Sequence, residues 1–285
     1  MANLREIRTR LRAIANIQQI TKAMELVAAS RLHKAQEKAL GSVTYSQKLK
    51  EIMENQLLTS NNHPFFIQHP VKKIAVIIIT SDKGLCGSYN TSILREADRF
   101  LESYETQIPE LVLLGRKGID HYRGKPWHIR ETAPDWGGKI TRADIKKISI
   151  PLMESFLSRE IDEVWIVYTS YINLFVRKVT IKKLLNIEQT EKKESSGTLD
   201  YIFEPNVEEI FDDLIPRYFI NQFQTAIHQA WASELAARTL SMRQAIKNAE
   251  EMEEKLTLLR NKIRQAGITS EMAEIASGAE GLKYS

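Results

Sequence analysis

A hydroxyl pair, a carboxylate, an ammonium and a thiol stand together in one short loop, Thr-Ser-Asp-Lys-Gly-Leu-Cys-Gly at residues 80–87. The loop follows an apolar run that predicts a strand and precedes a segment that predicts a helix. Backbone N–H groups at such a helix start often bind phosphate in α/β domains. The glycine spacing, however, matches neither a Walker loop nor the dinucleotide fingerprint. A tight strand-to-helix turn is therefore favoured, and a phosphate site stays open as the alternative.

Cys86 is the single cysteine of the chain. A helix start beside it could lower the pKa of its thiol and make it a nucleophile. No histidine lies near it in sequence to act as its base, so a buried structural thiol is the favoured interpretation. A single cysteine also excludes an intramolecular disulfide and is typical of a reducing compartment.

Metal-binding and acid–base patterns are absent from the sequence. No two histidines have helical metal-ligand spacing and no cysteine cluster accompanies them, so a zinc site is not expected. The six histidines are His33, His63, His69, His121, His128 and His228. The carboxylates of residues 250–254 form a run that is typical of a solvated helix face. We therefore predict no catalytic residue, no cofactor and no metal site in this chain.

The first helix is strongly basic, and three kinds of partner fit that charge. Nucleic acid or anionic lipid is one interpretation. No aromatic residue occurs before Tyr45, so the charge lacks a base-stacking platform. An acidic protein explains the charge equally well and the apolar seam better. The cations are Arg5, Arg8, Arg10, Arg12, Lys22, Arg31, Lys34 and Lys38.

Two long helices must position these groups. Leu4 to Leu58 predicts one helix of roughly 80 Å, with Gly41 as its weak point. Val207 to Leu282 predicts a second, which could break at Gly267. The expected seam of the first helix is Leu4, Ile7, Leu11 and Ile14, then Ile17, Ile20, Met24, Val27 and Leu32. The last helix carries small residues that would let a partner helix approach closely, at Ala226, Ala230, Ser233 and Ala237.

The middle of the chain changes period and predicts a small α/β domain with a largely parallel sheet. Strands are expected at residues 73–80, 110–114, 163–169 and 176–184, and helices at 90–104 and 116–122. Thr141 and Asp144 predict a capping box for a further helix, which Pro151 should kink or shorten. Because this domain separates the two long helices, they must run antiparallel if they pair. The predicted domains are residues 1–60, 70–204 and 207–285.

Three motifs resemble one known family, the ATP synthase gamma subunits. ITKAMELVAAS at residues 20–30 resembles its N-terminal signature, and SDKGLCG at 81–87 with Asn90 resembles its loop after the first strand. RNKIRQAGITSE at 260–271, followed by EIASGA at 274–279, resembles its C-terminal signature. The resemblance implies a fold of two long helices in an antiparallel coiled coil with an inserted Rossmann-like α/β domain.

The same resemblance implies a central rotor stalk that transmits torque between a membrane ring and a catalytic hexamer. Its implied partners are the alpha, beta, delta and epsilon subunits and the ring of c subunits. Lys22 and Met24 would face the acidic lever of a beta subunit, and Arg264, Gln265 and Thr269 would meet the beta catch loop. Tyr201, Phe203 and Glu204 would form the foot against the ring and epsilon. Trp231 departs from the family pattern, where small polar residues are expected.

The location follows from similar reasoning. No apolar run approaches the ~20 residues that a transmembrane helix needs, and the charged amino terminus lacks a signal peptide. The first signature begins almost at Met1, which leaves no room for a presequence and favours a bacterium. We therefore expect a soluble chain held on the cytoplasmic face of the bacterial inner membrane by its partners.

Two other functions remain open. One is an α/β enzyme or phosphate-ligand binder with a coiled-coil oligomerisation arm, which would use Gly84–Gly87. The other is a coiled-coil binder of nucleic acid or membrane surfaces, led by the basic first helix.

Overall fold

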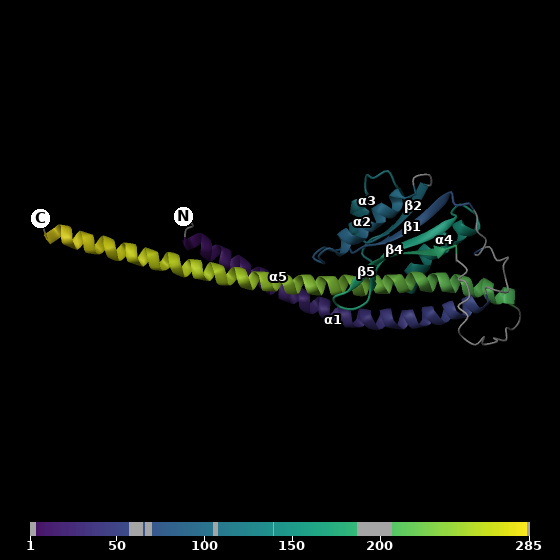
Figure 1. Cartoon of the computed structure of the whole chain (residues 1–285), viewed down its shortest axis with the longest axis horizontal. Coiled ribbons are helices and arrows are strands. Elements are labelled where there is room, and N and C mark those ends of the chain that lie inside the picture. Colours follow the sequence, from purple (N-terminus) through teal and green to yellow (C-terminus); the bar gives the residue numbers. More distant parts are fainter. Residues whose placement is uncertain are drawn as a thin grey trace. The chain divides into compact units, whose positions relative to one another are not determined.

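The computed structural model describes residues 4–56, 65, 70–104, 108–138, 140–186 and 207–283. Two compact units are present: residues 1–27 with 239–285, and residues 28–238. The elements in chain order are α1 (Leu4–Gln56), β1 (Lys73–Ile79), α2 (Tyr89–Glu102), β2 (Ile108–Leu114), α3 (Arg116–Tyr122), β3 (His128–Ala133), α4 (Arg142–Leu157), β4 (Glu163–Tyr171), β5 (Arg177–Leu185) and α5 (Val207–Lys283). Two long helices, with an α/β sheet domain inserted between them in the sequence, confirm the expected fold class (Figure 1).

The second unit contains one five-stranded sheet in the order β3-β2-β1-β4-β5. Strand β1 lies at its centre and pairs in parallel with β2 and β4, so that Val76 is opposite Leu111 on one side and Trp165 on the other. Strand β3 also pairs in parallel, whereas β5 is antiparallel to β4. The apolar run of β1 is buried as a central strand requires, because helices cover both faces of the sheet.

Helices cover both faces of this sheet. Successive side chains of a strand point to opposite faces. The face that holds Ala75 packs against α4 and α5, and the face that holds Ile74 packs against α2 and α3. The second unit is therefore a three-layer, Rossmann-like arrangement in which the early part of α5 is one of the covering helices (Figure 1).

Helix α4 begins as its sequence predicts. The backbone N–H of Asp144 donates to Thr141 Oγ1 at 3.2 Å, and that of Thr141 donates to Asp144 Oδ2 at 3.0 Å, which completes the capping box. Pro151 does not shorten this helix, which continues to Leu157, and the alternative expectation of a kink stays a prediction. Pro151 and Lys147 are exposed, so water can hydrate the Lys147 carbonyl that the proline leaves without its N–H partner.

Strand β3 has no counterpart among the strands expected from the sequence. It lies at the edge of the sheet, and its residues, HIRETA, are only partly buried. An edge strand with this composition shows neither a continuous apolar run nor a clear alternation.

In the second unit, α1 and α5 run antiparallel. Gln222 Nε2 donates to Ser46 Oγ at 2.7 Å, and Thr225 Oγ1 donates to the Ser42 carbonyl at 3.4 Å. Apolar contact continues along the pair between Leu32, Ala35 and Ala39 of α1 and Ala232, Leu235 and Ala236 of α5.

The small-residue stripe of α5 does not face α1 as expected. Ala226 and Ala230 belong to the apolar cluster on the sheet face that contains Ala75. Ser233 Oγ donates to the Thr169 carbonyl of β4 at 3.0 Å. The prediction of a close helix–helix seam at these residues is therefore wrong. Small side chains here allow α5 to lie close against the sheet, and the adjacent stripe of α5 meets α1.

In the first unit, the start of α1 pairs with the end of α5, again antiparallel. Arg243 Nε donates to Glu25 Oε1 at 2.7 Å, and Gln18 Nε2 donates to Glu250 Oε1 at 3.3 Å. Seven residues back along α1 thus correspond to seven residues forward along α5. Two helices paired with this register form the antiparallel coiled coil that was expected.

The seam of α1 differs from the expected one. Ile7 and Ile14 are buried, but Ile17, Ile20 and Val27 are 53%, 60% and 52% exposed. The seam instead continues its seven-residue repeat through three polar residues, Gln18, Thr21 and Glu25. All three are partly buried, and Gln18 and Glu25 also bond to α5. An apolar stripe is consequently left on the outside of the helix pair.

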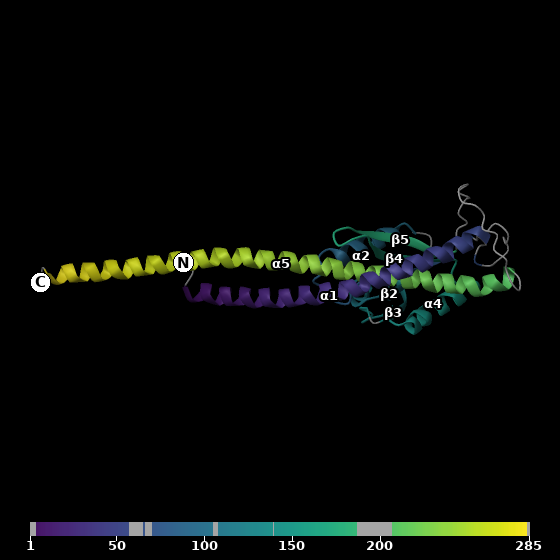
Figure 2. The same ribbon diagram turned by 90° about the horizontal axis from the view of Figure 1, so that it is seen from below.

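Helix α5 is unbroken at Gly267 and ends at Lys283, so the expectation of a break there is wrong. The register pairs Glu25 with Arg243, which places the first residues of α1 opposite α5 near Arg264. Beyond that point α5 continues as a single helix, past the amino terminus (Figure 2). Residues 264–277 are all exposed.

Candidate functional site: a buried junction and two exposed shaft surfaces

The loop after β1 lies where Rossmann-like folds bind ligands. The chain leaves β1 for β2 on one side and later returns to β4 on the other, so the crevice between β1 and β4 is the topological switch point. In this structure α5 closes that crevice. Tyr89 Oη donates to the Ala230 carbonyl at 3.1 Å, and Ser233 Oγ reaches the Thr169 carbonyl.

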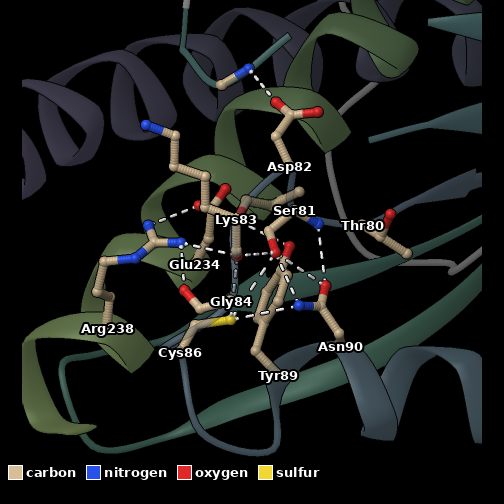
Figure 3. Close-up of polar contacts among 12 residues, drawn as sticks. Thr80, Ser81, Asp82, Lys83, Gly84, Cys86, Tyr89, Asn90, Glu234 and Arg238 are labelled. Atoms are coloured by element: carbon tan, nitrogen blue, oxygen red, sulfur yellow. Dashed lines mark hydrogen bonds and ion pairs between the residues drawn. The ribbon is translucent and has the colours of Figure 1, made fainter. Parts of the chain in front are cut away.

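The hydroxyl, carboxylate and thiol side chains of the loop are used for internal contacts, whereas the Lys83 side chain is exposed (Figure 3). The backbone N–H of Ser81 donates to Asn90 Oδ1 at 3.0 Å, and Asn90 Nδ2 donates to Ser81 Oγ at 2.7 Å. Asp82 accepts backbone N–H groups of Arg116, Asp135 and Gly137 at 3.1, 2.8 and 3.1 Å. With these side chains bonded and the crevice covered, the loop supports the tight-turn interpretation over a phosphate site.

Arg238 ties α5 to this loop. Its Nη2 donates to the carbonyls of Lys83 and Gly84 at 3.1 and 3.2 Å, and its Nη1 donates to Glu234 Oε1 at 2.6 Å (Figure 3). The two side chains are only 12% and 7% exposed. Burial raises the pKa of Glu234, and the Arg238 guanidinium opposes that rise. Nothing in the sequence analysis indicated this pair.

Cys86 is a buried thiol beside Ser81 and Asn90. Asn90 Nδ2 lies 3.3 Å from its sulfur, and the Ser81 hydroxyl lies 3.8 Å away. Burial raises the pKa of the thiol, which disfavours the thiolate that a nucleophile needs. The structural interpretation of this residue is therefore the better supported.

On the function that the family resemblance implies, replacing Cys86 with Ser should leave the ATPase activity of the assembled complex within a few-fold of the parent. Serine keeps the size of the side chain and can accept the Asn90 N–H, and no imidazole base is bonded to the thiol among the described residues. Steady-state hydrolysis by matched preparations measures this. Loss of turnover with assembly intact would show that the thiol takes part in chemistry.

The Trp231 indole of α5 packs against a glycine, Gly138, in the turn before α4. A Cβ at Gly138 would lie 2.2 Å from the indole, and Gly138 has φ +75°, which other residues rarely adopt. The Lys38 ammonium lies 5.6 Å from the ring centre. The indole that departs from the family pattern is thus packed between α1 and the turn before α4.

The residues expected at the beta lever lie on α1 in the first unit. Lys22 is exposed, and Met24 is half-buried at the edge of the seam, next to the Glu25–Arg243 ion pair. The outward apolar stripe of Ile17, Ile20 and Val27 flanks them at helical spacing. The sequence analysis placed this stripe in the seam and so missed it as a surface.

The residues expected at the catch loop lie on the single-helix end of α5. Arg264, Gln265 and Thr269 are exposed, and Thr269 Oγ1 donates only to the Gln265 carbonyl among the described residues, at 3.0 Å. A second apolar stripe accompanies them, with Ile268, Met272 and Ile275 exposed by 49%, 65% and 72%. About 20 helical residues, roughly 30 Å, separate this surface from the one around Met24. The structure therefore does not bring the two groups together.

The foot residues Tyr201, Phe203 and Glu204 lie outside the described residues.

Comparison with known proteins decides the family. The sequence profile described as ATP synthase matches residues 3–282. The ATP synthase gamma chain of Protochlamydia amoebophila is 49% identical over 285 residues, which cover 99% of this chain and 100% of that one. The chain belongs to the ATP synthase gamma chain family. A second gamma chain, from Desulfitobacterium hafniense, is 41% identical with the same coverage of both chains.

Solved gamma-type stalks share the fold. The rotor of the Euglena gracilis mitochondrial ATP synthase superposes with a TM-score of 0.67 at 18% identity, covering 93% of this chain and 98% of that one. The central stalk of the Tetrahymena thermophila enzyme gives 0.60 at 24% identity, covering 79% and 99%.

Family membership confirms the function expected from the three motifs. The chain functions as a gamma chain, a non-catalytic central-stalk subunit of ATP synthase. Among the described helices, none has a stretch both long and apolar enough to cross a bilayer.

Proposed function

We propose that the chain turns as the central shaft of a rotary ATP synthase and couples ion flow through a membrane ring to ATP synthesis or hydrolysis in a hexamer of alpha and beta subunits. The observation that carries this proposal is the outward apolar stripe on a paired two-helix shaft. Ile17, Ile20 and Val27 face away from α5, and an isolated helix pair has no reason to expose them. Exposed apolar stripes of this kind mark surfaces that contact a partner, and a collar of alpha and beta subunits around the shaft is such a partner.

The helix pair also suits the transmission of torque. Paired helices resist bending and twist better than one, and the register is fixed by polar contacts such as Glu25–Arg243. A single copy of this shaft has no threefold symmetry, so it presents a different face to each of three beta sites. Each site is then driven in turn through its binding states.

Two shaft surfaces would contact beta subunits. Lys22 and Met24 would meet the acidic lever, where exposed cations of α1 complement carboxylates. Arg264, Gln265 and Thr269 would meet the catch loop, because they are exposed on the unpaired end of α5 and have polar groups to offer a partner. The roughly 30 Å between the two surfaces would place these contacts at two different levels along the shaft.

Native co-purification tests the function as a whole. A tagged copy of the full chain should arrive with the alpha, beta and epsilon subunits, and from membranes also with the delta subunit and the c ring. If the chain is isolated with an unrelated set of proteins, or only with itself, the shaft function is wrong.

The foot assignment gives a separate prediction. Changing Tyr201, Phe203 and Glu204 together to Ala should reduce attachment to the rotor ring by at least several-fold while sparing ATP hydrolysis by the part released from the membrane. Two aromatics beside a carboxylate are typical of contact surfaces. Ring attachment is measured by the fraction of ATPase activity that stays with washed membranes. Unchanged attachment and unchanged proton pumping would mean that the foot lies elsewhere.

The chain would be held at a membrane by these partners. We propose that it lies on the cytoplasmic face of the bacterial inner membrane as part of the complex, attached through the ring rather than inserted itself. The high identity to bacterial gamma chains supports this location.

A further inference from the structure

A cavity of about 350 Å³ lies in the second unit between the two long helices and the sheet. Its walls come from α1, α5, β4 and β5, so four elements converge on one space. The volume falls at the lower end of the range of small-molecule sites. Val43 of α1, Ile166 of β4, Leu184 of β5 and Ala226 of α5 supply hydrocarbon surface. A guest that fills this space therefore needs a compact apolar body.

One wall carries a tyrosine hydroxyl without a partner. Tyr168 is a buried side chain of β4, and its Oη makes no hydrogen bond with the described residues. Unlike the Tyr122 hydroxyl, which is sealed from solvent, the Tyr168 hydroxyl keeps accessible surface. Burial raises the pKa of Tyr168, so the hydroxyl keeps its proton and can donate it.

Two glutamine amides of α5 present N–H groups because their oxygens are already used. Ser170 Oγ donates to Gln229 Oε1 at 2.7 Å, which leaves the amide nitrogen of Gln229 to donate. Since Tyr168 and Ser170 are two residues apart on β4, their side chains point to the same face, and the Gln229 amide shares a wall with the Tyr168 hydroxyl. Gln222 Nε2 donates to Ser46 Oγ at 2.7 Å, so Ser46 has its own O–H left to donate.

The cavity offers these donors without a free charge. None of the described lining residues is Asp or Glu. The one cation among them is Lys182, whose Nζ donates to Gln222 Oε1 at 2.6 Å and which takes part in a further interaction besides. An ion brought into such a space would lose its hydration without gaining an opposite charge. An uncharged guest avoids that cost.

We propose that this cavity binds a small uncharged carbonyl compound, namely a tertiary amide with a compact apolar body. The carbonyl oxygen of a tertiary amide has two lone pairs, and the group has no N–H of its own, so it matches a wall of donors. The oxygen would accept from the Tyr168 hydroxyl and the Gln229 amide, and the hydrocarbon part would lie against Ile166 and Leu184. Because the walls belong to both long helices and to the sheet, an occupied site would link α1, α5 and the domain. Binding needs only the full chain, so it does not depend on the torque function.

Three ring compounds separate the carbonyl group from charge. N-methylcaprolactam, protonated N-methylazepane and cyclohexanecarboxylate are titrated against the full-length chain by ligand-observed NMR, with thermal unfolding as a second readout. The lactam should bind in the millimolar range or tighter and raise the midpoint of unfolding. The azepane has the same ring with a positive charge in place of the carbonyl, and the carboxylate is negative, so each should bind several-fold more weakly. No binding of the lactam, or equal or tighter binding of either ion, would overturn the proposal.

Two variants locate the site. Tyr168→Phe keeps the ring and removes only the hydroxyl, so it should weaken lactam binding several-fold. Gln229→Leu removes the amide donors and should weaken binding to a similar extent, which tests the site even if Tyr168→Phe fails to fold. Tyr104→Phe makes the same change at a half-buried tyrosine outside the lining, and as the matched control it should bind like the parent. Parent-like affinity in folded Tyr168→Phe or Gln229→Leu would show that the lactam binds elsewhere and that the proposal is wrong.

Discussion

Replacing Arg238 with Met should lower the free energy of unfolding of the full chain by about 3–5 kcal/mol, the usual cost of leaving one partner of a buried ion pair alone. Glu234 would lose the donor at 2.6 Å and stay buried, and its second oxygen, Oε2, already lacks a partner among the described residues. The loop carbonyls of Lys83 and Gly84 would lose their shared donor as well. Urea unfolding followed by tryptophan fluorescence measures the change.

The pH dependence of that variant has a definite sign. The pKa of Glu234 is raised in the folded chain, chiefly by burial, and Arg238 opposes the rise. Without Arg238 the folded pKa moves higher still, so folding takes up a proton over a wider pH range. The loss of stability in Arg238→Met should therefore be smallest below the ordinary glutamate pKa. It should grow as the pH rises through the raised pKa of Glu234 in the folded chain.

Two controls isolate the buried pair. Adding Glu234→Gln to Arg238→Met removes the stranded charge and should recover most of the lost stability and its pH dependence. Arg243→Met makes the same change on the same helix at a pair whose side chains are 54% and 16% exposed, and it should cost at most about 1 kcal/mol. A loss in Arg238→Met no larger than that in Arg243→Met would contradict the importance of the pair.

Changing Met24 to Lys should uncouple ATP-driven proton pumping from hydrolysis. The thioether is uncharged and flexible, so it can pass a lever on beta without holding one orientation. An ammonium beside carboxylates adds a charge-assisted hydrogen bond of about 1.5–3 kcal/mol. If that bond forms at one rotary angle only, it deepens one dwell and raises the barrier to leaving it. Hydrolysis should persist while pumping falls, with a steeper temperature dependence.

Both activities are measured on the same membranes at several temperatures. Met24→Leu, which is also apolar and of similar volume, should keep the pumping-to-hydrolysis ratio of the parent. Since Met24 lies beside the Glu25–Arg243 pair, intact assembly of the Met24→Lys complex is checked first. An unchanged ratio in Met24→Lys would remove Met24 from the lever contact.

Local sequence signals predicted the elements well because they depend on neighbouring residues. The apolar run of β1, the capping box at Thr141 and Asp144, and the short helix Arg116–Tyr122 are all present. What failed was the assignment of helix faces. Ile17 and Ile20 continue an apolar pattern, yet the seven-residue repeat of a supercoiled pair runs through Gln18 instead. Periodicity finds an apolar stripe, and only the partner decides which stripe is buried.

The buried pair could not be predicted for a similar reason. Glu234 and Arg238 stand four residues apart on a helix, a spacing that usually indicates an exposed pair. Their burial depends on the Lys83–Gly84 loop, which is some 150 residues earlier in the chain. The stripe of Ala226, Ala230 and Ser233 is likewise compatible with a helix or a sheet as its neighbour, and the sequence does not distinguish them.

The covering of the sheet by α5 has a consequence for synthesis on the ribosome. The last strand, β5, ends at Leu185, but the face of the sheet around Ile77 is completed by Phe219, Phe223 and Ala230. At 5–20 residues per second, these residues follow the last strand by about 2–9 s. For that time the nascent chain displays the apolar part of one sheet face that α5 later covers. We therefore expect the growing chain to depend on a chaperone until the last helix emerges, and truncations before Ala230 to aggregate.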